Sequence, residues 1–465
     1  MSKITKLTKI TSTIGPSCMS VEKLIEMHNA GTDIYRNNFS HDSLDVQGQK
    51  IDNIRAAQKK VGKPFAVLVD LQGPKHRIGD FKDGQLSGLE KRYEIEAGKK
   101  YIFDSSAELG DETRVQLPDA DVRASLKVGD RLFLNDGKLE FKVVAKKGND
   151  VIETEIVRGG KIWCRRGFNL PDTEVASSVL TEKDRKDLEF GLTKNPDFVA
   201  ISFVQKAEDV LETREFIKAR TSAPVKIIAK LERPQAVGDR LESIIEAADV
   251  IMVARGDLAV EMPFEEVPAA QRRMIRICRA KNKPVIVATQ MMGSMMDNLF
   301  PSRAEVSDVA TAGYLFADST MTSEETSIGK YAVETTAAMG RILAATETDI
   351  LENDLDESDG DVYEGLNERY DNIVAYAEGE EVAAIIALDE TGDLARGLSC
   401  RKTGLPIVSV SSKDIIANQL CISRGVFPVV GSGVGDALRR DEVVAKGDRV
   451  VVVSEGGDKV EVVVL

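Results

Sequence analysis

The chain has 465 residues, a length that favours two to four domains. Its 62 lysines and arginines face 76 aspartates and glutamates, and the net charge of −14 disfavours nucleic acid or an anionic membrane as a partner. Hydrophobic residues make up 42% of the chain, enough for several cores, and no apolar run approaches the about 20 residues of a membrane span.

The cysteines and histidines limit the chemistry further. Five widely spaced cysteines include no Cys-x-x-Cys pair, and there are three histidines. This pattern disfavours disulfides and a zinc knuckle, and it fits a reducing compartment. Because no apolar signal-peptide core follows the N-terminal lysines, we expect a cytoplasmic protein.

Strand and helix patterns alternate along two parts of the chain. Lys9–Pro16, Asp33–Ser40 and Pro64–Gln72 predict strands, with helices between them, the first over Val21–Ala30. After residue 170 the alternation returns with five expected strands: Phe198–Val204, Val225–Glu232, Val250–Leu258, Pro284–Gln290 and Asp318–Glu325. Eight strand-then-helix units favour an α/β fold built on a closed (β/α)8 barrel, although periodicity leaves an open doubly wound sheet as the alternative.

Residues 73–167 interrupt this alternation with short apolar runs and turn signals. Val128–Val144 contains an Asp136-Gly137 hairpin signal, and Lys147–Asp150 marks a second turn. We therefore expect a small β domain inserted after the third barrel strand, which leaves residues 1–72 and 168–345 for the barrel.

The composition changes again at about residue 346, where we place the start of a C-terminal α/β domain, residues 346–465. The acidic stretch Glu352–Glu381 is interpreted as a solvated linker and helix face. Four strands are expected after it: Val382–Leu388, Pro406–Val410, Val426–Val430 and Arg449–Val453.

Charged residues stand at the C-terminal ends of the expected barrel strands, where barrel enzymes hold their active sites. Lys230 and Glu232 point to one side of the fifth strand, and Asp257 follows the sixth. Two carboxylates without histidine suit a hard cation such as Mg²⁺. Gly256 lets backbone N–H groups approach an anion. Ion pairs or helix caps explain each residue alone, but their combination at adjacent strand ends favours a functional site.

Other strand ends add a further cation and neutral oxygens. Arg36, Asn38 and Ser40 alternate onto one side of the second strand, Asp70 ends the third, and Thr289 follows the seventh. This set suits a phosphate beside a cation. The sequence contains neither a P-loop nor the protein-kinase signature set.

These residues lie in segments whose order and spacing resemble the pyruvate kinase family over nearly the whole chain. The matching segments are Thr8–Ser17, Arg36–His41, Asp70–Gly79, Gly167–Pro171, Lys230–Glu232, Ile251–Glu261, Ala288–Met291, Pro301–Val309 and Ser323–Thr326. The resemblance implies a barrel, an inserted β lid and a C-terminal α/β domain. It also implies phosphoryl transfer from phosphoenolpyruvate to ADP, giving pyruvate and ATP in glycolysis, and a homotetramer.

The resemblance assigns roles to individual residues. Glu232 and Asp257 would hold Mg²⁺, or Mn²⁺ in its place, and Lys230 and Arg36 would neutralise the phosphoryl group. The substrate carboxylate would meet Gly256, Asp257 and Thr289, and Thr289 would orient the water that protonates the enolate carbon. Nucleotide contacts are implied for five residues, of which Arg77 would also reach the phosphate: Thr13, Pro16, His41, Arg77 and Arg166.

The resemblance also bears on a monovalent cation. Many members hold K⁺ at the positions of Asn38, Ser40, Asp70 and the carbonyl of Leu71, and they carry Glu at the position of Lys75. Members with Lys there work without K⁺. We therefore expect a vestigial K⁺ site whose charge the Lys75 ammonium supplies.

Four residues depart from the family pattern and are expected near the rim of the site: Asn37, Asp42, Gly293 and Glu324. They keep open a catalytically weakened paralogue with a binding or regulatory role. A Mg²⁺-dependent pyruvate aldolase on a related barrel is the other alternative, although it would need neither the lid nor Lys230 and Arg77.

Overall fold

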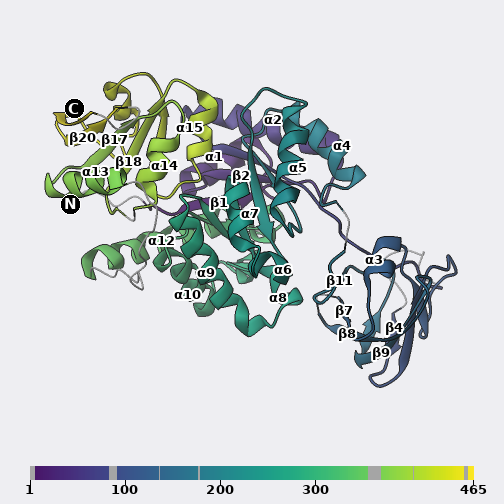
Figure 1. Ribbon diagram of the computed structural model, residues 1–465. Coiled ribbons are helices and arrows are strands. Elements are labelled where there is room, and N and C mark those ends of the chain that lie inside the picture. The colour runs from purple at the N-terminus through teal and green to yellow at the C-terminus, as the bar shows by residue number, and fades with distance from the viewer. Residues whose placement is uncertain are drawn as a thin grey trace.

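The computed structural model describes residues 6–82, 92–135, 137–175, 178–353, 368–401, 403–454 and 459–465. Eight parallel strands close into a barrel in the order β1-β16-β15-β14-β13-β12-β3-β2 (Figure 1). Their bounds are β1 Lys9–Thr13, β2 Ile34–Asn38, β3 Ala66–Asp70, β12 Phe198–Ile201, β13 Lys226–Leu231, β14 Val250–Ala254, β15 Val285–Ala288 and β16 Ser319–Thr322. Each lies within a predicted range, and the closure excludes the open sheet.

Helices surround the barrel. They are α1 Val21–Ala30, α2 Leu44–Val61, α4 Glu182–Leu192, α5 Ala207–Lys218, α6 Pro234–Val237, α7 Leu241–Ala247, α8 Arg255–Glu261, α9 Val267–Ala280, α10 Arg303–Tyr314, α11 Glu324–Ser327 and α12 Ala332–Asn353, with 3₁₀ turns η1 Phe264–Glu266 and η2 Gly293–Met296. Helix α1 has the predicted bounds because both ends are capped. The Ser20 side chain accepts a hydrogen bond from the Lys23 N–H, and Gly31 ends the helix with a φ of 120°.

The two-residue period of the strands aims charged side chains into the barrel. Three apolar residues from different strands belong to the cluster inside it: Ile34, Leu68 and Ile228. Two residues further along the same strands stand Arg36, Asp70 and Lys230. Because alternate residues share a face, the barrel interior changes from apolar to charged toward the C-terminal ends of the strands.

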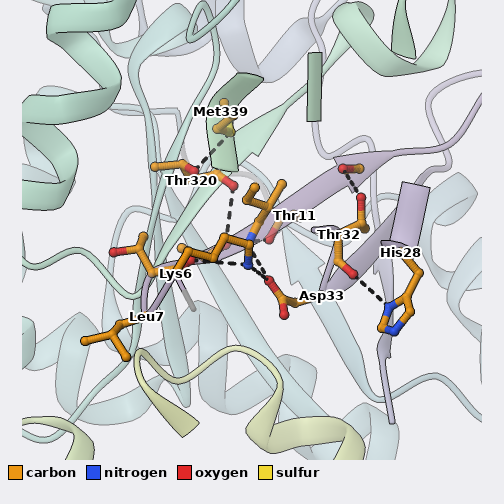
Figure 2. A network of polar contacts seen from close by, with 12 residues as sticks. Lys6, Leu7, Thr11, His28, Thr32, Asp33, Thr320 and Met339 are labelled. Atoms are coloured by element: carbon orange, nitrogen blue, oxygen red, sulfur yellow. Dashed lines mark hydrogen bonds and ion pairs between the residues drawn. The ribbon is translucent and has the colours of Figure 1, made fainter. Parts of the chain in front are cut away.

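A polar network fixes the opposite, N-terminal ends of β1 and β2 (Figure 2). Lys6 Nζ lies 2.5 Å from Asp33 Oδ2, which also accepts the N–H of Ile10 at 2.9 Å. Burial raises the pKa of Asp33, but the Lys6 and Lys9 charges outweigh it and hold this pKa below its ordinary value. His28 Nδ1 lies 3.1 Å from the Thr32 carbonyl. This end of the barrel therefore serves stability.

The segment between β3 and β12 forms a separate β domain, the lid, which stands apart from the barrel (Figure 1). Its strands are β4 Tyr93–Ile95, β5 Lys100–Asp104, β6 Arg114–Gln116, β7 Arg131–Leu134, β8 Leu139–Lys147, β9 Val151–Arg158, β10 Gly160–Ile162 and β11 Phe168–Asn169, with helix α3 Ala120–Ser125. Strands β4 and β10 pair, and the other six form one sheet, β11-β7-β8-β9-β5-β6.

Both predicted turns of the lid join paired strands, β7 to β8 and β8 to β9, although Asp136 lies outside the described residues. The lid sheet reaches beyond the boundary predicted at residue 167, since β11 pairs with β7. Strand β11 has only two residues, too few to give a strand pattern in the sequence, so the predicted boundary assigned them to the barrel.

Helix α12 passes through residue 346, the predicted start of the C-terminal domain, and packs against α1 and α10 of the barrel. The change in composition therefore lies inside a helix. Residues 354–367 of the acidic stretch lie outside the described part of the chain. The domain beyond has the sheet order β19-β18-β17-β20-β21. Its elements are α13 Glu368–Gly379, β17 Ala384–Leu388, α14 Asp393–Ser399, β18 Ile407–Ser411, α15 Asp414–Leu420, β19 Val426–Val430, η3 Val434–Arg439, β20 Arg449–Val453 and β21 Val460–Val464.

Two further expectations can be checked against the fold. All five cysteines are buried free thiols, as their spacing predicts, and burial raises the pKa of Cys400 and of Cys421 to about 12. In the part of the chain that the structure describes, no helix combines the length and the apolar character needed to cross a membrane.

Candidate active site

Four charged side chains meet at the C-terminal ends of β2, β3 and β13. Lys230 Nζ lies 3.0 Å from Glu232 Oε1 and 3.4 Å from Asp70 Oδ1. Arg36 Nε donates a hydrogen bond to Asp70 Oδ2 at 2.6 Å. We refer to Arg36, Asp70, Lys230 and Glu232 as the charged cluster. Asp70 thus holds both cations, a role that its position alone did not reveal.

Burial makes the electrostatics of the charged cluster strong, since the side chains of Asp70 and Glu232 are each 1% exposed. Burial raises the pKa of Asp70, but Lys230 and Arg36 outweigh it and hold this pKa below its ordinary value. Burial lowers the pKa of Lys230, but Asp70 and Glu232 outweigh it, so Lys230 keeps its charge. Burial also raises the pKa of Glu232; Lys230 opposes this rise, and the charge of Asp257 adds to it.

Glu232 and Asp257 have the chemistry of magnesium ligands. Glu232 Oε2 accepts the Phe203 N–H at 2.6 Å, which fixes the carboxylate, and half-buried Asp257 lies in the first turn of α8. No group of three or more candidate metal ligands occurs among the described residues. Two hard oxygen donors that repel each other, completed by substrate oxygens and water, fit Mg²⁺.

The turn after β15 brings Thr289 against Gly256. The Gly256 N–H donates to Thr289 Oγ1 at 2.7 Å, and the Thr289 hydroxyl donates to the Ala288 carbonyl at 2.6 Å. Thr289 has a φ of 71°, which L residues rarely adopt. Arg255 supports this turn: it donates to the Thr289 carbonyl at 2.7 Å and pairs with Asp308 at 2.7 Å. Arg255 lies in the same segment as Gly256, but its type and position alone predict no role for it.

The residues predicted to contact a nucleotide fall into three groups. Thr13 joins the charged cluster, because its hydroxyl accepts from Arg36 Nη1 at 2.9 Å and donates to the Thr322 carbonyl at 2.8 Å. Pro16 and His41 are exposed. A cavity of about 230 Å³ lies between the lid and the barrel, and we refer to it as the lid cavity. It is lined by Arg77, Arg166 and eleven other residues: Pro74, Lys75, His76, Asn135, Gly167, Phe168, Asn169, Phe203, Arg233, Asp257 and Glu261.

Comparison with known proteins agrees with this arrangement. The family model described as pyruvate kinase, barrel domain, matches residues 5–336, and the pyruvate kinase alpha/beta domain matches residues 371–461. The chain belongs to the pyruvate kinase family. It is therefore an enzyme of the phosphotransferase class.

Individual members of the pyruvate kinase family are similar over nearly the whole chain. The pyruvate kinase of Methylorubrum extorquens is 37% identical over 97% of this chain and 94% of its own. That of Geobacillus stearothermophilus is 36% identical over 96% of this chain and 77% of its own. A crystal structure of a pyruvate kinase from Cryptosporidium parvum matches with a TM-score of 0.89 at 30% identity, covering 99% of this chain and 96% of that one.

Three of the four oxygens expected to form a vestigial K⁺ site, those of Asn38, Asp70 and Leu71, have donors within the protein. Asn38 Oδ1 accepts the Ser40 N–H at 3.1 Å, and the Leu71 carbonyl accepts from Ser202 Oγ at 2.8 Å. Asp70 is committed to Arg36 and Lys230. Exposed Lys75 lines the lid cavity, and its side chain makes no hydrogen bond or ion pair within the described residues.

One departure from the pyruvate kinase pattern does not lie at the rim. Asn37 is fully buried, and its amide oxygen and nitrogen have no hydrogen-bond partner among the described residues. It alternates with Arg36 along β2 and faces away from the charged cluster. The other departures are exposed: Asp42, Gly293 and Glu324.

Proposed function

We propose that this protein is an active pyruvate kinase, which transfers the phosphoryl group of phosphoenolpyruvate to ADP in glycolysis, requires Mg²⁺ and works without K⁺. The charged cluster at the C-terminal end of the barrel is the observation that carries this proposal. The homotetramer implied by the resemblance and the cytoplasmic location implied by the free cysteines stay predictions.

The charged cluster suits phosphoryl transfer because of where charge develops. The loose transition state spreads negative charge over three equatorial oxygens, so fixed positive charge and positioning do most of the catalysis. Lys230 and Arg36 supply that charge, and buried Asp70 holds both in place. Glu232 and Asp257 would hold Mg²⁺, which supplies further positive charge beside the phosphoryl group and the enolpyruvate oxygen when bound.

The substrate carboxylate is assigned to the turn at Gly256 and Thr289. The Gly256 N–H already donates to the Thr289 hydroxyl, so a carboxylate oxygen can take over this hydrogen bond without leaving a donor unpaired. The released Thr289 hydroxyl then orients the water that protonates the enolate carbon. Arg255 keeps Thr289 in place from behind and acts as a positioning residue.

The nucleotide is assigned to the lid side of the site. The resemblance assigns Thr13, Pro16 and His41 to it from the barrel, and Arg77 and Arg166 line the lid cavity. Closure of the lid over both substrates would exclude water and so prevent hydrolysis of the phosphoryl donor.

Independence of K⁺ is supported by the partners of three of the four candidate oxygens. The oxygens of Asn38, Asp70 and Leu71 already accept hydrogen bonds from the protein, and Lys75 at the lid cavity would supply the positive charge. A tethered ammonium supplies positive charge with no binding equilibrium to satisfy.

The experiment that tests the function is a coupled assay of pyruvate formation from phosphoenolpyruvate, with and without ADP. We expect formation that needs both ADP and Mg²⁺ and stops when the metal is chelated. Binding of both substrates without turnover would instead favour the weakened paralogue. Pyruvate released from a larger keto acid without ADP would favour the aldolase.

A further inference from the structure

Arg233 is a buried cation at the edge of the lid cavity. It directly follows Glu232, precedes α6, and is 3% exposed. Its Nε and Nη1 atoms have no hydrogen-bond partner among the described residues. The guanidinium lies over the ring of Phe203, 5.5 Å from the centroid. A buried charge without an acceptor is unfavourable, because it loses its hydration without compensation.

The position of Arg233 gives it access to a ligand. It lines the lid cavity together with Arg77, Arg166 and Asp257. Three guanidinium groups therefore border one small cavity. Lys230 and Arg36 do not line this cavity, because they point into the barrel and pair with Asp70. The lid cavity is thus a second positively charged region, separate from the charged cluster.

Two basic residues that line a larger cavity, Arg55 and Lys63, behave differently. A cavity of about 570 Å³ between the barrel and the C-terminal domain is lined by Arg55, Lys63 and other residues. There Arg55 pairs with Asp197 at 2.9 Å and Lys63 with Glu442 at 2.8 Å. Those charges are paired directly within the protein, so they indicate no ligand, whereas two nitrogens of Arg233 have no hydrogen-bond partner among the described residues.

Glu261 is the internal group that competes for Arg233. It lines the same cavity, is 2% exposed, and accepts from Asn169 Nδ2 of the lid at 2.8 Å through Oε1. Its Oε2 has no partner among the described residues. Burial raises the pKa of Glu261, and the charge of Arg233 opposes this rise. The two groups therefore interact electrostatically, yet Arg233 keeps free donors for an anion.

We infer that Arg233 binds a phosphate oxygen of the nucleoside diphosphate in the lid cavity. The inference rests on the proposed function and deepens it by adding a nucleotide-binding residue. Phosphoenolpyruvate does not need Arg233, because its phosphoryl group lies with Lys230 and Arg36. The diphosphate instead occupies the cavity that Arg77 and Arg166 border from the lid.

The test compares Arg233→Met, Arg233→Lys and the control Arg240→Met, which removes an exposed arginine paired with Glu174. We expect Arg233→Met to raise the KM for ADP about tenfold to 100-fold, the range of a hydrogen bond to a charged group, and to leave the KM for phosphoenolpyruvate unchanged. Calorimetric binding of MgADP without phosphoenolpyruvate should weaken by the same factor. Arg233→Lys should recover part of the lost ADP affinity, and Arg240→Met should change neither the KM for ADP nor the binding of MgADP.

Thermal melting separates binding from a structural role. Removing an unpaired buried charge should leave the Tm of ligand-free Arg233→Met no lower than that of the unmodified protein, while the Tm rise on adding MgADP shrinks. A lower Tm with an unchanged MgADP shift would assign Arg233 to the fold, with Glu261 as its partner, and overturn the inference. Unchanged ADP affinity, or a rise confined to the KM for phosphoenolpyruvate, would overturn it too. Absence of ADP-dependent pyruvate formation in the unmodified protein would refute the proposed function, whereas the calorimetry would still test Arg233.

Discussion

Replacing Lys230 with methionine removes one of two positive charges from the charged cluster while keeping a long side chain. Asp70 retains Arg36 at 2.6 Å, but Glu232 loses the ammonium that lies 3.0 Å from its Oε1. Loss of one preorganised charge from the transition state lowers kcat about 10²–10³-fold. Breaking a buried ion pair on one side destabilises the fold by about 3–5 kcal/mol.

Magnesium should restore part of that lost stability, because a cation held by Glu232 and Asp257 replaces the missing charge. The measurements are initial rates of pyruvate formation at saturating substrates and melting curves with and without Mg²⁺. Lys226→Met is the matched control, since Lys226 begins the same strand and pairs with Asp249 at 3.4 Å, away from the site. If Lys230→Met kept more than about a tenth of the activity, Lys230 would not be the group that stabilises the transferring phosphoryl.

Four further outcomes are expected. Glu232→Gln and Asp257→Asn should each raise the Mg²⁺ concentration needed for half-maximal rate, with partial rescue by excess metal; an unchanged requirement in both would place the metal elsewhere. The unmodified protein should be as active with a bulky organic cation as with K⁺, whereas Lys75→Glu should make the activity depend on K⁺. The measurement is the initial rate against K⁺ concentration at fixed ionic strength, and a several-fold activation of the unmodified protein by K⁺ would contradict the expectation. Burial raises the pKa of Asp318 from 3.8 to about 6, so the folded state binds the carboxyl proton more tightly than the unfolded state does. The stability that this protonation contributes at low pH is lost as the pH rises through about 6. The unfolding free energy of Asp318→Asn should therefore rise relative to that of the unmodified protein between pH 4 and 7, by up to about 3 kcal/mol. A difference in denaturation midpoints that does not change with pH would refute this. Asn37→Leu should stabilise the fold by about 1–3 kcal/mol in the same measurement, because it removes two buried polar atoms without partners; a lower midpoint would show that the amide has a role.

The barrel could be predicted from the sequence because strand-then-helix units recur along the chain, and five of the eight strands are mainly apolar runs: β3, β12, β13, β14 and β15. The convergence of Lys230 and Glu232 could be predicted as well, since it follows from strand parity. The same alternation places Asn37 on the face of β2 opposite to Arg36, so its burial away from the charged cluster was also predictable. The remaining features depend on tertiary geometry. Thr289 accepts the Gly256 N–H from a turn with a positive φ, and two nitrogens of Arg233 have no hydrogen-bond partner in the part of the chain that the structure describes.

The lid is attached to the barrel in a way that leaves the barrel complete without it. Strands β3 and β12, which flank the lid in the sequence, pair directly, with Leu68 opposite Phe198 and Asp70 opposite Ala200. The segments that leave and re-enter the barrel also meet, at a bridge between Arg77 and Gly167. The lid has a hydrophobic core of its own. It is therefore a removable module: a chain in which a short loop replaces it keeps every barrel strand pair, and the same point would accept another folded unit whose ends lie equally close.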